Sequence, residues 1–144
     1  MKLALFKKEN HWVIYERKEN ERIFRGRIIP FPTKNSFTIS FEGSKVKVRT
    51  IPNETIIPLR LKSSSVNLKG LLFENETKKQ ISWHLMNSDS PFINVEQKHH
   101  KISISNHSEE LAFIELHDNK KLELNIIKNE LAPNILIGSI ICLL

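Results

Sequence analysis

The residues of this chain that are best suited to chemistry are cations on short predicted strands. From Lys45 to Arg49 the chain alternates between a cation and valine, so Lys45, Lys47 and Arg49 are expected on one face of a strand. Arg25 and Arg27 show the same spacing. Clustered Lys and Arg side chains bind phosphate and carboxylate groups. The sequence therefore predicts an anion-binding surface at Arg25, Arg27, Lys45, Lys47 and Arg49, with a solvated face that binds nothing as the alternative.

The charge distribution favours an anionic partner for the first part of the chain. Alternation along the strand expected at 22–29 places Arg25 and Arg27 opposite Phe24 and Ile28. Residues 22–49 contain 7 Lys or Arg and a single acid, Glu42. Residues 1–60 contain 13 basic and 6 acidic residues, a net charge of +7, whereas residues 61–144 contain 9 and 10, a net charge of −1. Such asymmetry is typical of proteins that meet a polyanion.

Motifs for catalysis or metal binding are missing from the sequence. It has only 4 glycines and no Gly-x-Ser-x-Gly, phosphate-binding loop or dinucleotide-binding pattern. His99 and His100 are adjacent, so on a strand their rings would point to opposite faces, and no pair of histidines has the spacing His-x-x-x-His. Cys142, the only cysteine, lies in an apolar tail. We expect a non-enzymatic protein without a metal or cofactor.

Nucleic acid is a weaker candidate partner than a lipid surface or a protein. Binding to single strands needs exposed aromatic side chains among the cations. Aromatic residues make up 8% of this chain, and most of them fit inward positions of the predicted strands.

The elements that position these cations are predicted to be β-strands. Two hairpins stand out, one over 36–51 with a turn at Glu42-Gly43-Ser44, and one over 111–127 with a turn at 117–120. Pro30, Pro52 and Pro58 are expected to interrupt or end strands. Further strands are predicted at 12–17, 22–29, 59–61, 66–73, 80–85, 92–95 and 101–105. About ten strands at this spacing are typical of a sandwich or a barrel.

The last fourteen residues, 131–144, carry no charge and must be shielded from water. Pro133 and Asn134 predict a helix start, with Asn134 as the capping residue. A helix that is apolar on every side is buried on every side. A buried strand is the alternative, and so is a membrane anchor, although fourteen helical residues reach about 21 Å against a hydrocarbon core of about 30 Å. Gly138 would let neighbouring side chains approach the helix closely.

Many short strands followed by one apolar C-terminal helix resemble the tubby C-terminal domain and its relatives, the LURP-one-related proteins and phospholipid scramblases. The resemblance lies in the strand over 111–116, the hairpin into 122–127 and the terminal run 132–144. It covers most of the chain as a pattern, and this chain is shorter than typical members. It implies a closed barrel threaded by a hydrophobic helix. Tubby domains of eukaryotes bind phosphoinositide head groups, which makes anionic lipid a candidate ligand here.

Together these features predict a mainly β protein of one domain over residues 1–144. We expect a closed or nearly closed antiparallel β-barrel of about 10–12 short strands around a hydrophobic C-terminal helix. The expected function is binding to anionic lipid head groups or another acidic partner, and the alternative is a structural or protein-interaction module with no small-molecule ligand. One cysteine and an apolar run of only four residues, 3–6, before Lys7 favour the cytoplasm, peripheral to a membrane and without a span.

Overall fold

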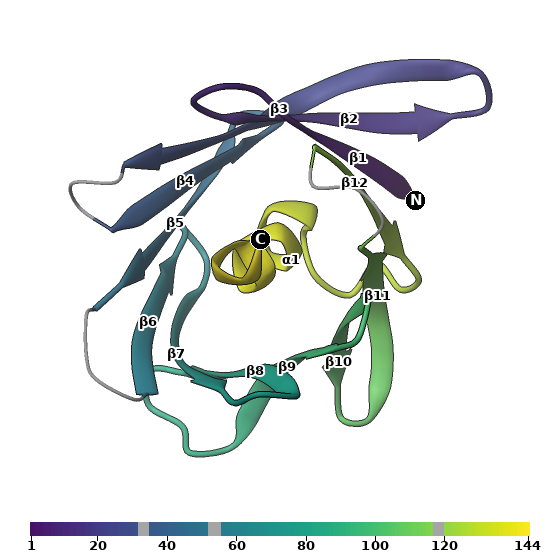
Figure 1. Cartoon of the computed structure of the whole chain (residues 1–144). Coiled ribbons are helices and arrows are strands. Elements are labelled where there is room, and N and C mark those ends of the chain that lie inside the picture. Colours follow the sequence, from purple (N-terminus) through teal and green to yellow (C-terminus); the bar gives the residue numbers. More distant parts are fainter. Residues whose placement is uncertain (32–34, 52–55, 117–119) are drawn as a thin grey trace.

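Strands run up and down around a central helix (Figure 1). The structure, a computed structural model, describes residues 1–31, 35–51, 56–116 and 120–144, and within them twelve strands form a closed barrel. The strands lie around the barrel in chain order, and β1 pairs with β12 to close it. Their bounds are β1 Lys2–Lys7, β2 Trp12–Lys18, β3 Glu21–Phe31, β4 Ser36–Phe41, β5 Ser44–Thr50, β6 Ile56–Lys62, β7 Asn67–Glu74, β8 Lys78–Leu85, β9 Pro91–Lys98, β10 Lys101–Asn106, β11 Glu109–Glu115 and β12 Lys121–Ile126.

The predicted barrel is therefore confirmed, and alternation along its strands separates the lumen from the outer surface. On β5 the side chains of Val46 and Val48 point inward and are fully buried, whereas Lys45, Lys47 and Arg49 are exposed. Each strand is antiparallel to both of its neighbours. Closure pairs every strand edge, and the inner face needs an apolar filler.

That filler is α1, the helix Pro133–Ile140, which continues into a short 3-10 turn, η2, at Ile141–Leu143. The helix lies in the lumen (Figure 1), and all of its residues after Pro133 are buried. This confirms a buried helix rather than a buried strand. The prediction that Asn134 caps the helix is wrong. Ala132 is the N-cap and Pro133, whose φ suits the first turn, begins the helix, so Asn134 already lies inside it.

Two contacts fix the helix to the barrel wall. The buried indole of Trp83 on β8 donates a hydrogen bond from Nε1 to the backbone oxygen of Ser139, at 3.0 Å. A Cβ at Gly138 would lie 3.0–3.3 Å from the side chains of Leu61, Val46 and Val48. The prediction that Gly138 permits close approach is thus confirmed, and β5 and β6 press directly on the helix.

Several strand predictions need correction. The sequence analysis missed β1, because Leu3, Ala4 and Leu5 form a continuous apolar run instead of an alternating one, and all three are buried. Pro30 does not end β3, which pairs with β4 as far as Phe31. Pro58 lies within β6, where pairing with β5 begins only at Leu59. Pro52 and most of the turn predicted at 117–120 lie outside the described residues.

Candidate anion-binding surface

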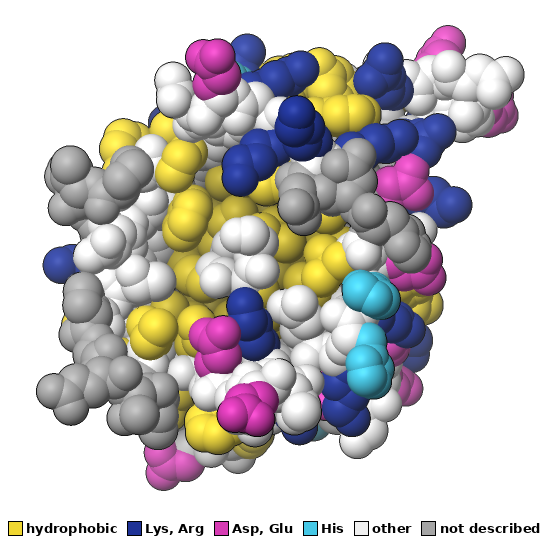
Figure 2. Space-filling view, viewed as in Figure 1, with side chains coloured by type: hydrophobic (Ala, Val, Ile, Leu, Met, Phe, Trp, Pro, Cys, Tyr) yellow, Lys and Arg dark blue, Asp and Glu magenta, His cyan; other side chains and the backbone are white. Residues whose placement is uncertain are grey.

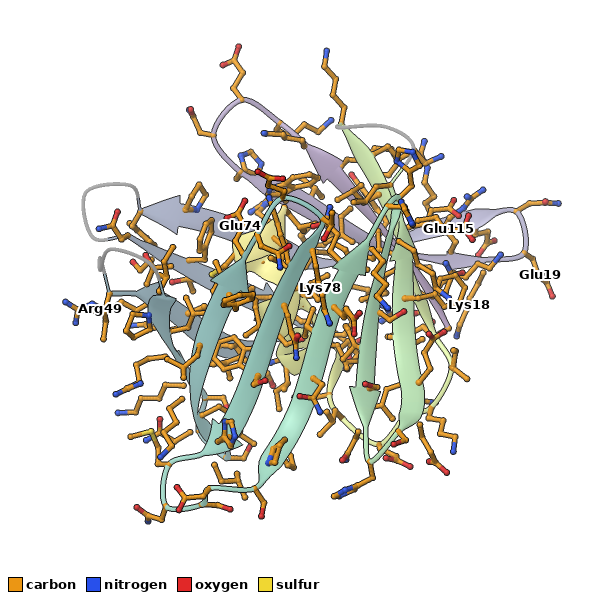
Figure 3. All side chains as sticks on the ribbon, turned by 60° about the horizontal axis from the view of Figure 1, so that its bottom comes forward. Lys18, Glu19, Arg49, Glu74, Lys78 and Glu115 are labelled. Carbon is orange, nitrogen blue, oxygen red and sulfur yellow. The ribbon has the colours of Figure 1, made fainter. Side chains whose placement is uncertain are left out.

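The outer surface of β5 presents the cations that the alternation predicts. Lys45, Lys47 and Arg49 are exposed, and the valines between them face the lumen. Figure 3 shows Arg49 pointing outward from the barrel wall, away from α1. One strand thus supplies three cations of the predicted surface.

Strand β6 adds two cations that the sequence analysis missed. Register pairs Lys47 with Lys62 and Arg49 with Arg60, so each of these β5 cations lies directly opposite another on β6. The alternating run Leu59-Arg60-Leu61-Lys62 does indicate that both cations point outward from one strand. The register that places them opposite the β5 cations is a property of the fold. We call the five exposed cations Lys45, Lys47, Arg49, Arg60 and Lys62 the basic face.

No described acid neutralises the basic face. Within the described part of the chain, none of its five cations forms an ion pair with a carboxylate. Strands β4, β5 and β6 contain no acidic residue. Like charges that face each other across a strand pair destabilise a sheet. The structure therefore keeps an unfavourable arrangement on this face.

The basic face is hollowed into a groove of about 750 Å³. Four of its cations line the groove: Lys47, Arg49, Arg60 and Lys62. The floor and ends add hydroxyl and amide groups from Ser36, Thr38, Thr50 and Asn35, together with Phe31, Phe37 and Val48. Cations combined with neutral hydrogen-bonding groups suit a phosphate or carboxylate ligand.

The basic face ends toward β7. Arg60 pairs in register with Lys69, and both residues border a second hollow that also contains Asp89. Beyond β6 the outer surface therefore carries both signs of charge. The all-positive surface is limited to β5 and β6.

Arg25 does not join the basic face. A bulge between Ile14 and Tyr15 shifts the β2–β3 register, and the Arg25 guanidinium turns to two carboxylates. It donates from Nε to Oε2 of the buried Glu16 at 2.8 Å and is also paired with Glu42. The hydrogen bond with Glu16 is the main reason that the pKa of Arg25 is raised. The positive charge of Arg25 is thus neutralised by carboxylates of the protein itself.

Arg27 lies on the outer surface, separated from the basic face by one strand, β4. Its register partner on β4 is Ser40, whose partner on β5 is Lys45, so two strand spacings of about 10 Å in total separate the cations. The guanidinium of Arg27 lies 5.3 Å from the ring centre of Phe24. The prediction that Phe24 faces away from Arg27 is therefore wrong, because the bulge brings both to the outer face.

Other aromatic side chains are also on the outside, contrary to the prediction that most point inward. The ring of Tyr15 makes edge contacts with Phe6 and Phe24, and Arg22 lies over both Phe6 and Tyr15. These rings are covered by cations and by one another. Trp12 and Trp83, by contrast, are buried.

The described histidines and the cysteine offer no further site. His99 and His100 form the turn between β9 and β10 instead of lying on a strand. In the described ranges no group of three His, Cys, Asp or Glu side chains is placed to hold a metal ion. Burial raises the pKa of the Cys142 thiol to about 12, which makes it a poor nucleophile.

No family model, curated protein or solved structure matches this chain. The likeness to tubby-related barrels stays a prediction from the sequence pattern. Among the described helices, neither α1 nor η2 has the length and apolar character needed to cross a bilayer.

Proposed function

We propose that this protein is a non-enzymatic β-barrel module that binds an anionic phospholipid surface through the basic face. One observation carries the proposal. Lys47 faces Lys62 and Arg49 faces Arg60 across neighbouring strands, around a groove, and no described carboxylate pairs with any of them. Repulsion within this cluster is relieved when a phosphate enters it, so the arrangement gains from an anion.

A membrane surface suits the shape and position of this cluster. The basic face runs along two strands of the outer wall and extends toward Arg27, which gives a row of cations instead of a closed pocket. Each Lys or Arg near an anionic bilayer strengthens binding by about 1 kcal/mol. Resemblance to tubby-related barrels adds support from the sequence. The protein would then be peripheral to a membrane.

Vesicle co-sedimentation tests the proposal. Wild type is expected to sediment with phosphatidylserine-containing vesicles but not with pure phosphatidylcholine vesicles, and to be released as salt shortens the Debye length. Replacing Lys47 and Arg49 by alanine should weaken binding about thirtyfold. The double reversal Lys47→Glu with Arg49→Glu should abolish it, and so should Arg60→Glu with Lys62→Glu.

A matched control reverses two cations outside the basic face. Lys2 and Lys8 are exposed, at the start of β1 and in the loop after it, and neither forms an ion pair with a described carboxylate. Lys2→Glu with Lys8→Glu changes the net charge by the same amount and should retain most of the binding. Equal loss of vesicle binding in the basic-face variant and in the control variant would show that net charge alone explains the binding. Absence of wild-type binding to acidic vesicles would refute the proposal and leave the protein-interaction module as the explanation.

A further inference from the structure

The end of the barrel where the C-terminus emerges has an apolar groove that none of the described residues fills. It measures about 570 Å³ and is lined by Phe37, Ile57, Leu72, Ile141, Cys142 and Leu144 among others. We call it the mouth groove. Figure 2 looks onto this end and shows an apolar area in the centre with charged side chains around it.

Two side chains of the mouth groove are exposed although both are apolar. Phe31 is 43% exposed and Leu144 is 36% exposed. Deeper in the groove, Leu72 and Ile141 are almost fully buried. An open apolar hollow whose floor is part of the core is typical of a ligand site.

The mouth groove is continuous with the basic groove. Phe31, Asn35, Ser36, Phe37 and Thr50 line both of them. Arg49 precedes Thr50 on β5 and faces Arg60, so cations stand where the apolar hollow turns onto the outer wall. A ligand that fills both grooves must have an anionic end next to an apolar end.

We propose that the mouth groove holds an acyl chain of an anionic phospholipid, whose phosphate lies on the basic face beside Arg49 and Arg60. The inference rests on the proposed function and specifies it, because contact with head groups alone would leave the mouth groove empty. The lipid comes from the bilayer on which the basic face docks. The barrel would then sit with its C-terminal end turned toward the membrane.

Cys142 provides the readout, because it lines the mouth groove and is the only cysteine in the chain. Alkylation by N-ethylmaleimide, followed by intact mass, reports access to the groove. The raised thiol pKa makes this reaction slow, so it is run in mildly alkaline buffer. Dihexanoylphosphatidylserine, a short-chain soluble lipid, should slow alkylation several-fold. Glycerophosphoserine, which has the head group without chains, should not, and dihexanoylphosphatidylcholine should protect less.

One variant blocks the mouth groove without touching the basic face. Leu144→Glu places a carboxylate at an exposed position that lines the mouth groove alone, so it should fold and should lose protection by the lipid. Leu85→Glu is the matched control, since Leu85 is 44% exposed at the end of β8. It should keep full protection. Lys47→Glu with Arg49→Glu should lose protection as well, because the phosphate contact is removed.

The outcomes separate the two proposals. Binding of wild type to acidic vesicles without protection of Cys142 overturns the acyl-chain inference and leaves the proposed function standing, while failure of both measurements overturns both. The inference that one lipid spans both grooves is overturned if the phosphatidylcholine analogue protects Cys142 equally well. It is also overturned if protection is unchanged in the Lys47 and Arg49 double variant. Alkylation that slows with protein concentration in the absence of lipid identifies a second copy as the occupant, which also overturns it.

Discussion

Arg25 and Arg27 are two positions apart in β3, yet their charges serve different purposes. The β2–β3 bulge directs Arg25 to Glu16, a carboxylate that is only 4% exposed, while Arg27 stays on the outer surface over Phe24. A buried carboxylate needs a partner. The role of Arg25 is therefore structural, and Arg27 is the one of the two that remains available to an anion.

Removing Glu16 should destabilise the protein. Glu16→Ala leaves the partly buried Arg25 without its main partner, and hydrogen bonds to charged groups are worth about 1.5–3 kcal/mol. Glu42→Ala is the control, because Glu42 also pairs with Arg25 but its side chain is 53% exposed, so the expected loss is below about 0.5 kcal/mol. Urea unfolding measures both. Equal losses would contradict a buried role for Glu16.

At the scale of elements, the β5–β6 pair gives up stability on its outer surface. Register places Lys62 directly across from Lys47, so two positive charges face each other. A negative charge at one of these two positions would attract the positive charge at the other. Lys62→Glu should thus raise the free energy of unfolding by about 0.2–1 kcal/mol. The same variant should bind acidic vesicles more weakly than wild type.

This opposite movement of stability and binding is what a functional cluster of like charges requires. Thermal unfolding and vesicle co-sedimentation of Lys62→Glu measure the two quantities on one protein. Lys8→Glu, in the loop after β1 and without a partner across a strand pair, is the control and should change neither by much. A fall in stability for Lys62→Glu would show that the facing cations cost the sheet nothing.

Helix α1 is the element on which the barrel most depends. Ile137 is fully buried in the lumen, so Ile137→Ala should cost about 2–5 kcal/mol of unfolding free energy. Ile137→Asp or Ile140→Asp would bury a charge and should abolish soluble folded protein. Ile127→Ala, at a site 53% exposed, should change stability by less than about 0.5 kcal/mol. A folded, monomeric Ile137→Asp protein would contradict the structure.

The same elements show what sequence reasoning can predict here. Alternation along β5 and the uncharged tail after Glu130 were sufficient for the outward cations and for the helix in a barrel, because both are local patterns. The pairing of Lys47 with Lys62 depends on register between strands, and the turning of Arg25 depends on a bulge where β3 pairs with β2, at Arg25 itself. Neither is encoded in the spacing of one segment, so Arg60 and Lys62, two of the five cations of the basic face, were missed.

At the scale of the whole molecule, the lumen is occupied by the protein's own chain. Side chains of β4, β5 and β9 pack against α1, and Trp83 is bonded to it. A barrel that is filled in this way has no room for a ligand at its centre. Recognition is left to the outer wall and to the mouth groove, where the two proposals place it.

The order of elements along the chain also has a consequence for synthesis. The helix that fills the lumen follows all twelve described strands, and β1 must find β12 across more than a hundred residues. The ribosome thus releases a set of strands whose apolar faces have no partner until the last segment emerges. Such long-range pairing is slow, and until it forms the nascent chain is prone to aggregate. This protein would therefore need chaperones during synthesis to a greater degree than the stability of its folded state suggests.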